Sequence, residues 1–495
     1  MTLWPHQSRG IITLRRLSRQ HRRILIVGPT GCGKTAFANE VAIGAVARRN
    51  RLLFVVHTQE LLIQAYEAFT AAGLRVGIIQ GDHATDVDAP IHVGMSQTLQ
   101  RRDIGQYTII VIDEAHLHVE TQAIDRILAA NPNAYVYGLT ASPWRLDSRP
   151  MGRIYQAIFN LATPSELVAQ RILVPHRCFG PPGPDLSKIQ IVNGDYHQAQ
   201  LEAVCNTADV TGDVASEYVK RRRPDGRYPS TLLFATSVAH SITCRNALRV
   251  LGVRAEHVDG NTPTERRVDL VRQLRDREID VLCNVQILTT GFDYRGLEAI
   301  SMARPTQSLA LFLQICGRVL RASPETGKTE ALILDHVGNV MRHGFPLADR
   351  EWTLEQAKKR AKLAEALPTL RTCGQCFAIF YTAPTCPECG YVFPIVTREI
   401  ETRAGDLTEI AVAYTREQRE VEFQRICRVA IAARLGRRFV SKTYTKQFGM
   451  RPVGFAWPKE LPENLAAKRS ELEHVARTRG YPSAWVDKAM GGAKR

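Results

Sequence analysis

The sequence has no long apolar stretch and has fewer acidic than basic residues. None of its apolar runs approaches the roughly 20 residues that a membrane-spanning helix needs, which argues against a membrane protein. The N-terminal residues also lack the apolar stretch of a secretory signal. Acids number 49 against 65 lysines and arginines, a formal net charge of +16. This excess favours a polyanionic partner, most often nucleic acid, over a merely soluble cationic enzyme.

Cysteine is used in two ways. Seven of the eleven cysteines are scattered through segments with strand or helix patterns, as reduced intracellular cysteines usually are. The other four form two Cys-x-x-Cys pairs. This distribution indicates a reducing compartment and one metal site rather than a disulfide framework.

A phosphate-binding loop follows the apolar run at residues 24–27, which we interpret as a short buried strand. Residues 28–35 read GPTGCGKT and match G-x-x-x-x-G-K-T in full, and a helix is expected from about residue 36 to 47. In such a loop the backbone amides and the helix N-terminus cradle phosphates, the lysine reaches the β- and γ-phosphates and the threonine holds Mg²⁺. We therefore expect ATP or GTP to contact Gly28, Thr30, Gly31, Cys32, Gly33, Lys34 and Thr35.

A second nucleotide motif, DEAH at residues 113–116, directly follows the apolar run at 109–112. Ligands bind at such C-terminal strand ends in open α/β sheets. Asp113 can hold Mg²⁺ through a water molecule, and Glu114 can orient and deprotonate the water that attacks the phosphate. Beside a phosphate loop, this interpretation is favoured over a charged strand cap.

These motifs and the later segments resemble, in their order, the superfamily 2 helicases. The resemblance covers roughly residues 1–345 and implies an α/β fold with two tandem RecA-like parallel-sheet domains, at 1–165 and 166–345. The matching segments are LWPHQ at 3–7, VVHTQELLIQ at 55–64, HVGMSQTLQRR at 92–102, LTASPWR at 139–145, TLLFATSVAHS at 231–241, HVDGNTPTERR at 257–267, DVLCNVQILTTGFD at 280–293 and QICGRVLR at 314–321.

In the first half, the resemblance assigns adenine recognition to Gln7 and the link between hydrolysis and domain movement to Thr140 and Ser142. Trp4 stands where the family often has arginine, and is either an adenine-stacking ring or part of the core. The resemblance also implies contacts with the nucleic-acid backbone, although each segment alone is compatible with a strand-to-helix junction and a polar cap. The expected contacts are His57, Thr58, Gln64, Ser96, Gln97 and Thr98.

The segment QICGRVLR carries the most specific prediction for the second half. If it is helical, Gln314, Arg318 and Arg321 share one face. Guanidinium groups suit phosphates because they are planar and permanently charged. The resemblance assigns these residues to the γ-phosphate across the domain cleft, with Arg321 as an arginine finger and Arg318 as its partner; a surface basic helix is the alternative. It also implies nucleic-acid contacts at Asp259, Gly260, Thr289 and Thr290, and nucleotide contacts at Gly291 and Asp293.

A charged segment at 346–368, interpreted as a linker helix, precedes two Cys-x-x-Cys pairs within 369–396. Four soft thiolates in a closed site select zinc and indicate a structural metal in a zinc ribbon; an iron–sulfur cluster and unliganded thiols are the alternatives. Such a ribbon needs its metal to fold, and would serve as a nucleic-acid grip or as a protein-docking element. The predicted ligands are Cys373, Cys376, Cys386 and Cys389.

The last region, residues 397–495, is expected to be mainly helical, with helical spacing at 416–435. Residues 423–458 contain eight lysines and arginines and no acid. Basic side chains suit phosphates and exposed rings can stack on bases, so we expect nucleic-acid contact that includes Arg437 and Arg438. A solvated basic face above core aromatics is the alternative. The interleaved rings are Phe439, Tyr444, Phe448, Phe455 and Trp457.

Within superfamily 2, the TASP segment and the compact size look most like the repair-helicase, branch-migration and type III restriction motor group, and the tail is similar to that of phage and prophage helicases. The resemblance implies an enzyme that uses ATP, Mg²⁺ and Zn²⁺ and acts as a helicase on single-stranded or branched DNA. We expect it in the cytoplasm of a bacterial or phage-infected cell. A duplex DNA translocase that does not unwind and an RNA helicase are the alternatives, and a protein partner could bind the ribbon or the C-terminal region.

Overall fold

The computed structural model describes residues 3–81, 83–102, 104–118, 122–143, 150–181, 183–192, 195–223, 225–285, 287–288, 294–355, 369–394, 414–433, 435–459, 473 and 477. The chain divides into two compact units, Met1–Ile395 and Val396–Arg495. None of the helices in the described ranges is long and apolar enough to cross a lipid bilayer.

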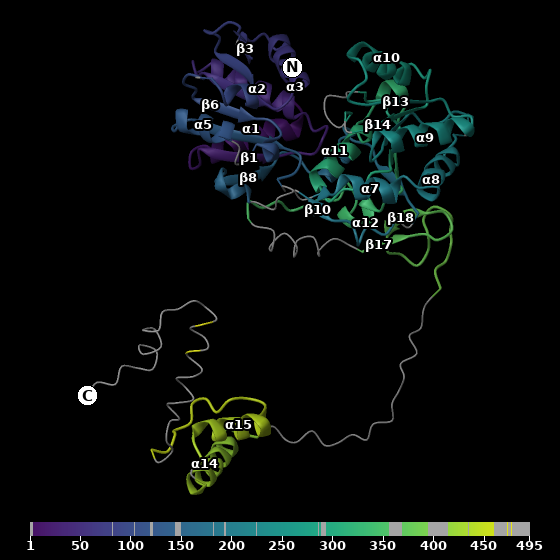
Figure 1. Cartoon of the computed structure of the whole chain (residues 1–495). Helices are drawn as coiled ribbons and strands as arrows, with labels where there is room; N and C mark the ends of the chain where they lie inside the picture. Colours follow the sequence, from purple (N-terminus) through teal and green to yellow (C-terminus); the bar gives the residue numbers. More distant parts are fainter. Residues whose placement is uncertain are drawn as a thin grey trace. The chain divides into compact units, whose positions relative to one another are not determined.

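The phosphate loop and the DEAH segment each follow a strand of the first sheet of the larger unit. This sheet and its helices form the first lobe (Figure 1). Its strand order is β4-β3-β5-β2-β6-β7-β1-β8, and neighbours pair in parallel except β3 and β4. Ile24, Leu25 and Ile26 in β1 are fully buried, as expected for a parallel strand covered on both faces. The strands are β1 Arg23–Val27, β2 Leu52–Val56, β3 Val76–Gln80, β4 His83–Ala84, β5 Ile91–Met95, β6 Ile109–Ile112, β7 Tyr135–Thr140 and β8 Ala157–Asn160. The helices are α1 Pro5–Leu17, α2 Lys34–Val46, α3 Gln59–Ala71, α4 Ser96–Leu99 and α5 Gln122–Ala130, with short 3-10 turns at Ala115–Leu117 and Met151–Arg153.

The second sheet follows the connecting helix α6 (Pro164–Ala169) and with its helices forms the second lobe. Its strand order is β13-β14-β12-β15-β16-β9-β18-β17, parallel from β13 to β9 and antiparallel beyond. Because β17 and β18 flank the first cysteine pair, the cysteine-rich hairpin continues this sheet. The strands are β9 His176–Phe179, β12 Thr231–Phe234, β13 Ala255–Val258, β14 Val281–Asn284, β15 Ala299–Met302, β16 Ala331–Asp335, β17 Leu370–Thr372 and β18 Ala378–Tyr381, with a separate hairpin of β10 Ile191–Val192 and β11 Asp195–Tyr196. The helices are α7 Gln198–Cys205, α8 Ala208–Val219, α9 Val238–Val250, α10 Thr264–Arg275, α11 Leu309–Val319 and α12 Asn339–His343, with a 3-10 turn at Pro324–Thr326.

The prediction that Arg321 lies on a helical face is wrong, because α11 ends at Val319, two residues before Arg321. Beyond this point the backbone pairs with the chain that enters the second lobe. The amide of Val174 donates to the carbonyl oxygen of Leu320 at 2.8 Å, and Arg321 forms an antiparallel bridge with Leu173. Long-range strand pairing therefore overrides the helical pattern at the end of QICGRVLR.

Residues 346–355, the start of the segment interpreted as a linker helix, are irregular in the structure; residues 356–368 lie outside the described ranges. Trp352 and Leu354 pack against a hydrophobic cluster of the first lobe. The amide of Gly152 also donates to the carbonyl oxygen of Leu354 at 3.1 Å. This stretch therefore returns from the second lobe to the first.

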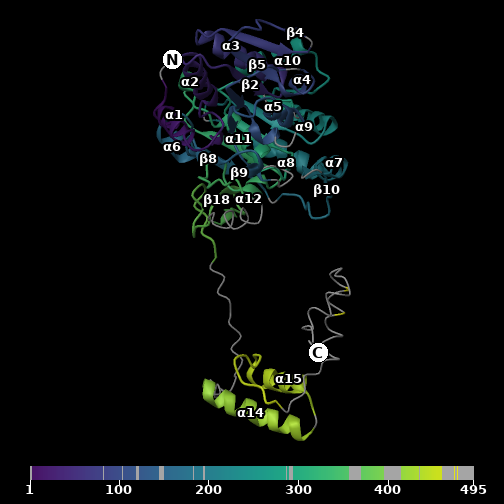
Figure 2. The same cartoon turned by 90° about the vertical axis from the view of Figure 1, so that its left-hand side faces the viewer.

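The smaller unit contains two packed helices, α14 (Arg416–Ala432) and α15 (Arg437–Phe448) (Figure 2). Phe423, Cys427 and Val440 are fully buried between them. Tyr444 is 1% exposed, whereas Phe439 is 40% exposed. Tyr444 therefore belongs to the core, because so small a unit needs aromatic rings to fill its interior, whereas base stacking by the half-buried and exposed rings remains a prediction. The rings that pack in or against this core are Tyr444, Phe448, Phe455 and Trp457.

Candidate active site

The phosphate loop runs from the end of β1 to the first turn of α2. Gly31 and Gly33 have φ angles of +93° and +76°, a left-handed conformation that residues with a Cβ rarely adopt. The Lys34 ammonium group donates to the carbonyl oxygen of Gly28 at 3.0 Å. Thr35 is exposed in the first turn of α2. The loop thus holds its lysine against its own backbone, beside the amides that begin the helix.

Gln7 lies in contact with this loop. Its side-chain amide donates to the carbonyl oxygens of Cys32 at 3.3 Å and Gly33 at 3.1 Å, and 2% of the residue is exposed. His6 Nε2 donates to the same Cys32 oxygen at 2.9 Å. The Trp4 ring borders Gly33, where a Cβ would lie 3.1 Å from it, and 36% of Trp4 is exposed. Gln7 therefore supports the loop backbone, while its adenine contact and the two readings of Trp4 remain predictions.

The acidic pair lies at the C-terminal end of β6. Burial, with a further effect from neighbouring Glu114, raises the pKa of Asp113 above its ordinary value, so a cation beside it would be favourable. Glu114 has a φ angle of +44°, which is uncommon for a residue with a side chain.

His116 connects this acidic pair with the LTASP segment. Its Nδ1 lies 3.4 Å from Glu114 Oε2 and 3.0 Å from Thr140 Oγ1. The Thr140 hydroxyl in turn donates to the carbonyl oxygen of Ser142 at 2.7 Å, and both residues are fully buried. Sequence reasoning assigned no role to His116, although its place as the last residue of DEAH pointed to it.

The second lobe reaches the phosphate loop at two points. A Cβ on Gly31 would lie 3.3 Å from Arg321 Cγ, so the Arg321 side chain lies beside the loop. Helix α11 meets the loop at Gly317, where a Cβ would lie 2.7 Å from Thr30 Cγ2, closer than real Cβ atoms approach. Glycine at this position is what lets the helix backbone reach Thr30. The other two predicted residues of this helix are half-buried: Gln314 and Arg318.

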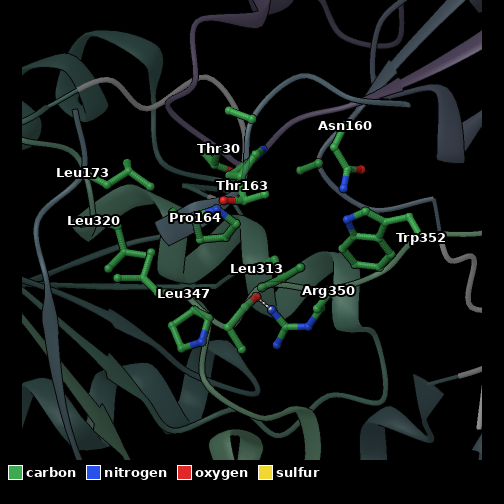
Figure 3. Close-up of a pocket in the computed structure, with 16 residues that line it drawn as sticks. Thr30, Asn160, Thr163, Pro164, Leu173, Leu313, Leu320, Leu347, Arg350 and Trp352 are labelled. Atoms are coloured by element: carbon green, nitrogen blue, oxygen red, sulfur yellow. Dashed lines mark hydrogen bonds between the residues drawn. The ribbon is translucent and has the colours of Figure 1, made fainter. Parts of the chain in front are cut away.

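A small pocket lies beside this meeting point (Figure 3). Thr30 and Thr163 from the first lobe's side face Leu313 of α11 across it. Arg350 lines the pocket and donates to the carbonyl oxygen of Ala348 at 3.0 Å. Its volume of about 40 Å³ has room for a few water molecules.

Three groups of predicted nucleic-acid contacts, at 57–58, 96–98 and 259–260, follow strands β2, β5 and β13, at the C-terminal ends of parallel strands. Thr58 Oγ1 accepts from the amide of Leu61 at 3.3 Å and caps α3. Asp259 Oδ1 accepts from the amide of Thr262 at 2.9 Å and holds a turn. Both residues thus have a local structural role, and their contact with nucleic acid remains a prediction.

The remaining predicted contacts differ in exposure. Gln64, Gln97 and Gly260 are exposed, His57 and Thr98 are half-buried and Ser96 is buried. Four predicted residues lie outside the described ranges: Thr289, Thr290, Gly291 and Asp293.

The four predicted metal ligands form one cluster. Their sulfur atoms all lie within 4.8 Å of one another, and the Cys373–Cys389 and Cys376–Cys386 sulfur pairs are each 3.7 Å apart. Zinc–thiolate bonds of about 2.3 Å in a tetrahedron place sulfurs about 3.8 Å apart, so the geometry fits a four-thiolate metal. An ion pair between Glu388 and Arg177 of β9 joins the cluster to the second sheet, with a hydrogen bond of 2.9 Å.

In the smaller unit, Arg437 and Arg438 begin α15. The guanidinium group of Arg437 lies over the Trp457 ring, 5.4 Å from its centre. Arg438, Lys442 and Lys446 recur at every fourth position and are exposed, so they share one face of the helix. This basic face is available, and its contact with nucleic acid remains a prediction.

Comparisons with known proteins agree with the two-lobed arrangement. Residues 1–145 match the family described as "Type III restriction enzyme, res subunit", and residues 218–323 match "Helicase conserved C-terminal domain". A 51.5 kDa protein of a Lactococcus phage is 28% identical over 77% of this chain and 80% of its own length. A Saccharomyces cerevisiae protein named as an ATP-dependent helicase, IRC3, is 27% identical over 64% of this chain and 48% of its own length, so this chain spans about half of it. A structure named as a fragment of a type I restriction enzyme HsdR subunit, from Vibrio vulnificus, has a TM-score of 0.52 at 21% identity, covers 68% of this chain and 64% of that chain, and shows the shared fold.

Proposed function

Because the chain belongs to the superfamily 2 helicases, with a restriction-type first motor domain and a helicase C-terminal domain, we propose that it moves along DNA and separates its strands or migrates its branches. The observation that carries this proposal is the position of Arg321, which reaches from the second lobe to Gly31 of the phosphate loop. A motor of this kind needs a charge that approaches the nucleotide from the opposite lobe, so that binding and hydrolysis change how the lobes meet.

In the proposed reaction, the loop amides and Lys34 hold the β- and γ-phosphates. Glu114 deprotonates the attacking water, and its contact with His116 fixes its orientation. Arg321 stabilises the charge that develops on the γ-phosphate. Thr35 and Asp113 offer the oxygen ligands that Mg²⁺ prefers, and the bound ion would neutralise phosphate charge.

Movement would follow from the contact between Thr30 and Gly317. The negative charge of ATP between the lobes attracts Arg321 and Arg318, and this holds α11 against the loop. Hydrolysis and phosphate release weaken that attraction, and the lobes separate. Backbone grips at the strand ends of both lobes, such as those around Thr58 and Asp259, would then advance in turn along one strand.

We favour DNA as the track because of the net charge of +16 and the restriction-enzyme character of the first domain. Gln314 also stands where DEAD-box RNA helicases carry histidine. The likeness to restriction-enzyme subunits supports a second candidate, a translocase that moves on duplex DNA without separating it.

For the four-cysteine cluster we propose a structural zinc ion. The donor set and the sulfur spacing support this assignment. The antiparallel hairpin that carries Cys373 and Cys376 adds to the second sheet beside β9, so the metal would stabilise that edge of the motor.

The proposal is tested by ATPase and strand-displacement assays with single-stranded DNA, forked DNA, duplex DNA and RNA. We expect strong ATPase stimulation by single-stranded or forked DNA and release of the displaced strand, and Glu114→Gln should abolish both. Stimulation by duplex DNA without displacement would replace the proposal with the translocase. Stimulation by RNA alone would contradict it.

A further inference from the structure

Lys328 is buried next to the backbone of Arg321. After Arg321 the chain turns back through Gly327, which has a φ angle of +68°, and Lys328 forms an antiparallel bridge with Ser323. The Lys328 ammonium group donates to the carbonyl oxygen of Arg321 at 2.9 Å and to that of Arg295 at 3.1 Å. Only 6% of Lys328 is exposed. The lysine thus binds the backbone of the predicted arginine finger from inside the second lobe.

Burial of the charged Lys328 side chain at this position costs free energy. Burial lowers the pKa of Lys328 to about 7; the charge of Glu298 opposes this shift and that of Arg321 adds to it. Glu298 is itself paired with Arg223 at 2.6 Å and with Arg277 at 2.7 Å. An apolar side chain of similar shape would fill the same space without this cost. The N–H donors of Lys328 are therefore important because of the two backbone carbonyl oxygens that they bind.

The two acceptors belong to different functional segments. Arg321 ends the QICGRVLR segment, and its other side is held by the bridge to Leu173 of the entering chain. Arg295 follows closely on the segment at 280–293, which the sequence relates to nucleotide and nucleic-acid contact. Lys328 thus joins the backbones of two segments that must respond together when the lobes close.

We propose that Lys328 is a positioning residue for ATP hydrolysis: its ammonium group fixes the backbone from which Arg321 reaches the phosphate loop and ties it to the chain at Arg295. This inference rests on the proposed role of Arg321. Removing the donors should let Arg321 shift, and a misplacement of about 1 Å can cost about 10²-fold in rate. ATP binding through Lys34 and the loop amides should remain.

The test is a double-mutant cycle with Lys328→Met and Arg321→Ala, measured as ATPase kcat and KM in the full chain with single-stranded DNA. We expect Lys328→Met to lower kcat about 10²-fold with a change in KM below about threefold. In the Arg321→Ala background the same substitution should cause no further loss, because Lys328 acts through Arg321. Lys328→Gln, which keeps an N–H donor, should retain more activity than Lys328→Met. Lys220→Met, at an exposed lysine paired with Glu217, is the matched control and should keep its kcat.

Thermal unfolding of each variant separates misfolding from misplacement. If Lys328→Met does not fold, Lys328→Gln replaces it in the cycle, with the same non-additive pattern expected. Losses that multiply in the double variant, or a wild-type kcat in Lys328→Met, would overturn the inference while leaving the proposed function intact. Normal hydrolysis in Arg321→Ala would overturn the arginine assignment itself, and the inference with it.

Discussion

The two lobes of the larger unit share a parallel-sheet core but present opposite chemistry to each other. The first lobe presents backbone amides after β1 and the half-buried acidic residues Asp113 and Glu114 after β6. The second lobe presents Arg318 of α11 and Arg321, which lies two residues beyond the end of this helix. The phosphate loop is built from consecutive residues, whereas Arg321 depends on contacts with Leu173 and Lys328 from elsewhere in the chain. The phosphate loop is therefore formed by local sequence, whereas the position of Arg321 depends on the alignment of distant segments.

The largest expected effect concerns the outer edge of the second sheet, to which the antiparallel cysteine hairpin adds. Removing the metal with a chelator, or by Cys386→Ser, should unfold residues 369–394, because structural zinc contributes on the order of 10 kcal/mol to small modules. Hydrogen exchange should show lost protection in β17 and β18 and unchanged protection in β1 and β6. Restored zinc should restore protection after chelation. Unchanged exchange in β18 after metal removal would contradict a structural role.

The fold was predictable where local pattern decides it. Apolar runs followed by glycine or acid identify β1 and β6 as buried strands, and cysteine spacing identifies the metal cluster. The sequence does not reveal that the cysteine hairpin joins β9, because that pairing connects Phe179 with Ala378, far apart along the chain. For the same reason the end of α11 was missed, since its final turn competes with the pairing of Leu320 and Val174.

The second prediction addresses the contact between the lobes. Gly317→Ala should lower ATPase kcat about 10²-fold, because the added methyl group meets Thr30 and keeps α11 away from the loop. The free energy of unfolding of the second lobe should not decrease, since alanine favours a helix by about 1 kcal/mol over glycine. Gly44→Ala in α2 is the matched control, because its Cβ would meet only the flexible end of Arg48. Equal kcat in Gly317→Ala and wild type would show that the lobes need not approach this closely.

The third prediction is a difference in acid stability between the lobes. Among the described residues, burial lowers the pKa of His176, His240 and His343 to about 4 and that of His336 to about 3 in the second lobe, and that of His118 to about 3 in the first. These histidines are neutral when folded, so below about pH 6.5 the unfolded chain binds more protons. Stability should fall as the pH drops from about 6.5 toward 4, by up to about 1.4 kcal/mol per histidine and pH unit.

Hydrogen-exchange protection at pH 7 and pH 5, corrected for intrinsic exchange rates, measures this difference lobe by lobe. Protection should fall more in β12 and β15 than in β1 and β6. His240→Gln should reduce the acid loss of the second lobe, whatever its effect at pH 7. An equal loss in both lobes would contradict the assignment.

The candidate site was predictable to a similar extent as the fold. Lys34, Asp113 and Glu114 lie in contiguous motifs whose chemistry their order reveals. Lys328 was missed because its neighbours in the sequence form a turn. Its proposed role depends on a hydrogen bond to the carbonyl oxygen of Arg321, seven residues earlier in the chain. The aromatic residues near Tyr444 suggested a binding surface because composition alone does not distinguish exposed rings from a small core.

The most direct test of the central claim is a structure of the chain with ADP, a γ-phosphate analogue such as beryllium fluoride, Mg²⁺ and single-stranded DNA. We predict that the phosphate loop encloses the analogue and that the guanidinium group of Arg321 lies within about 3 Å of it, at hydrogen-bond distance. A closed complex in which the Arg321 guanidinium lies out of reach of the analogue would contradict the claim that the second lobe completes the ATP site.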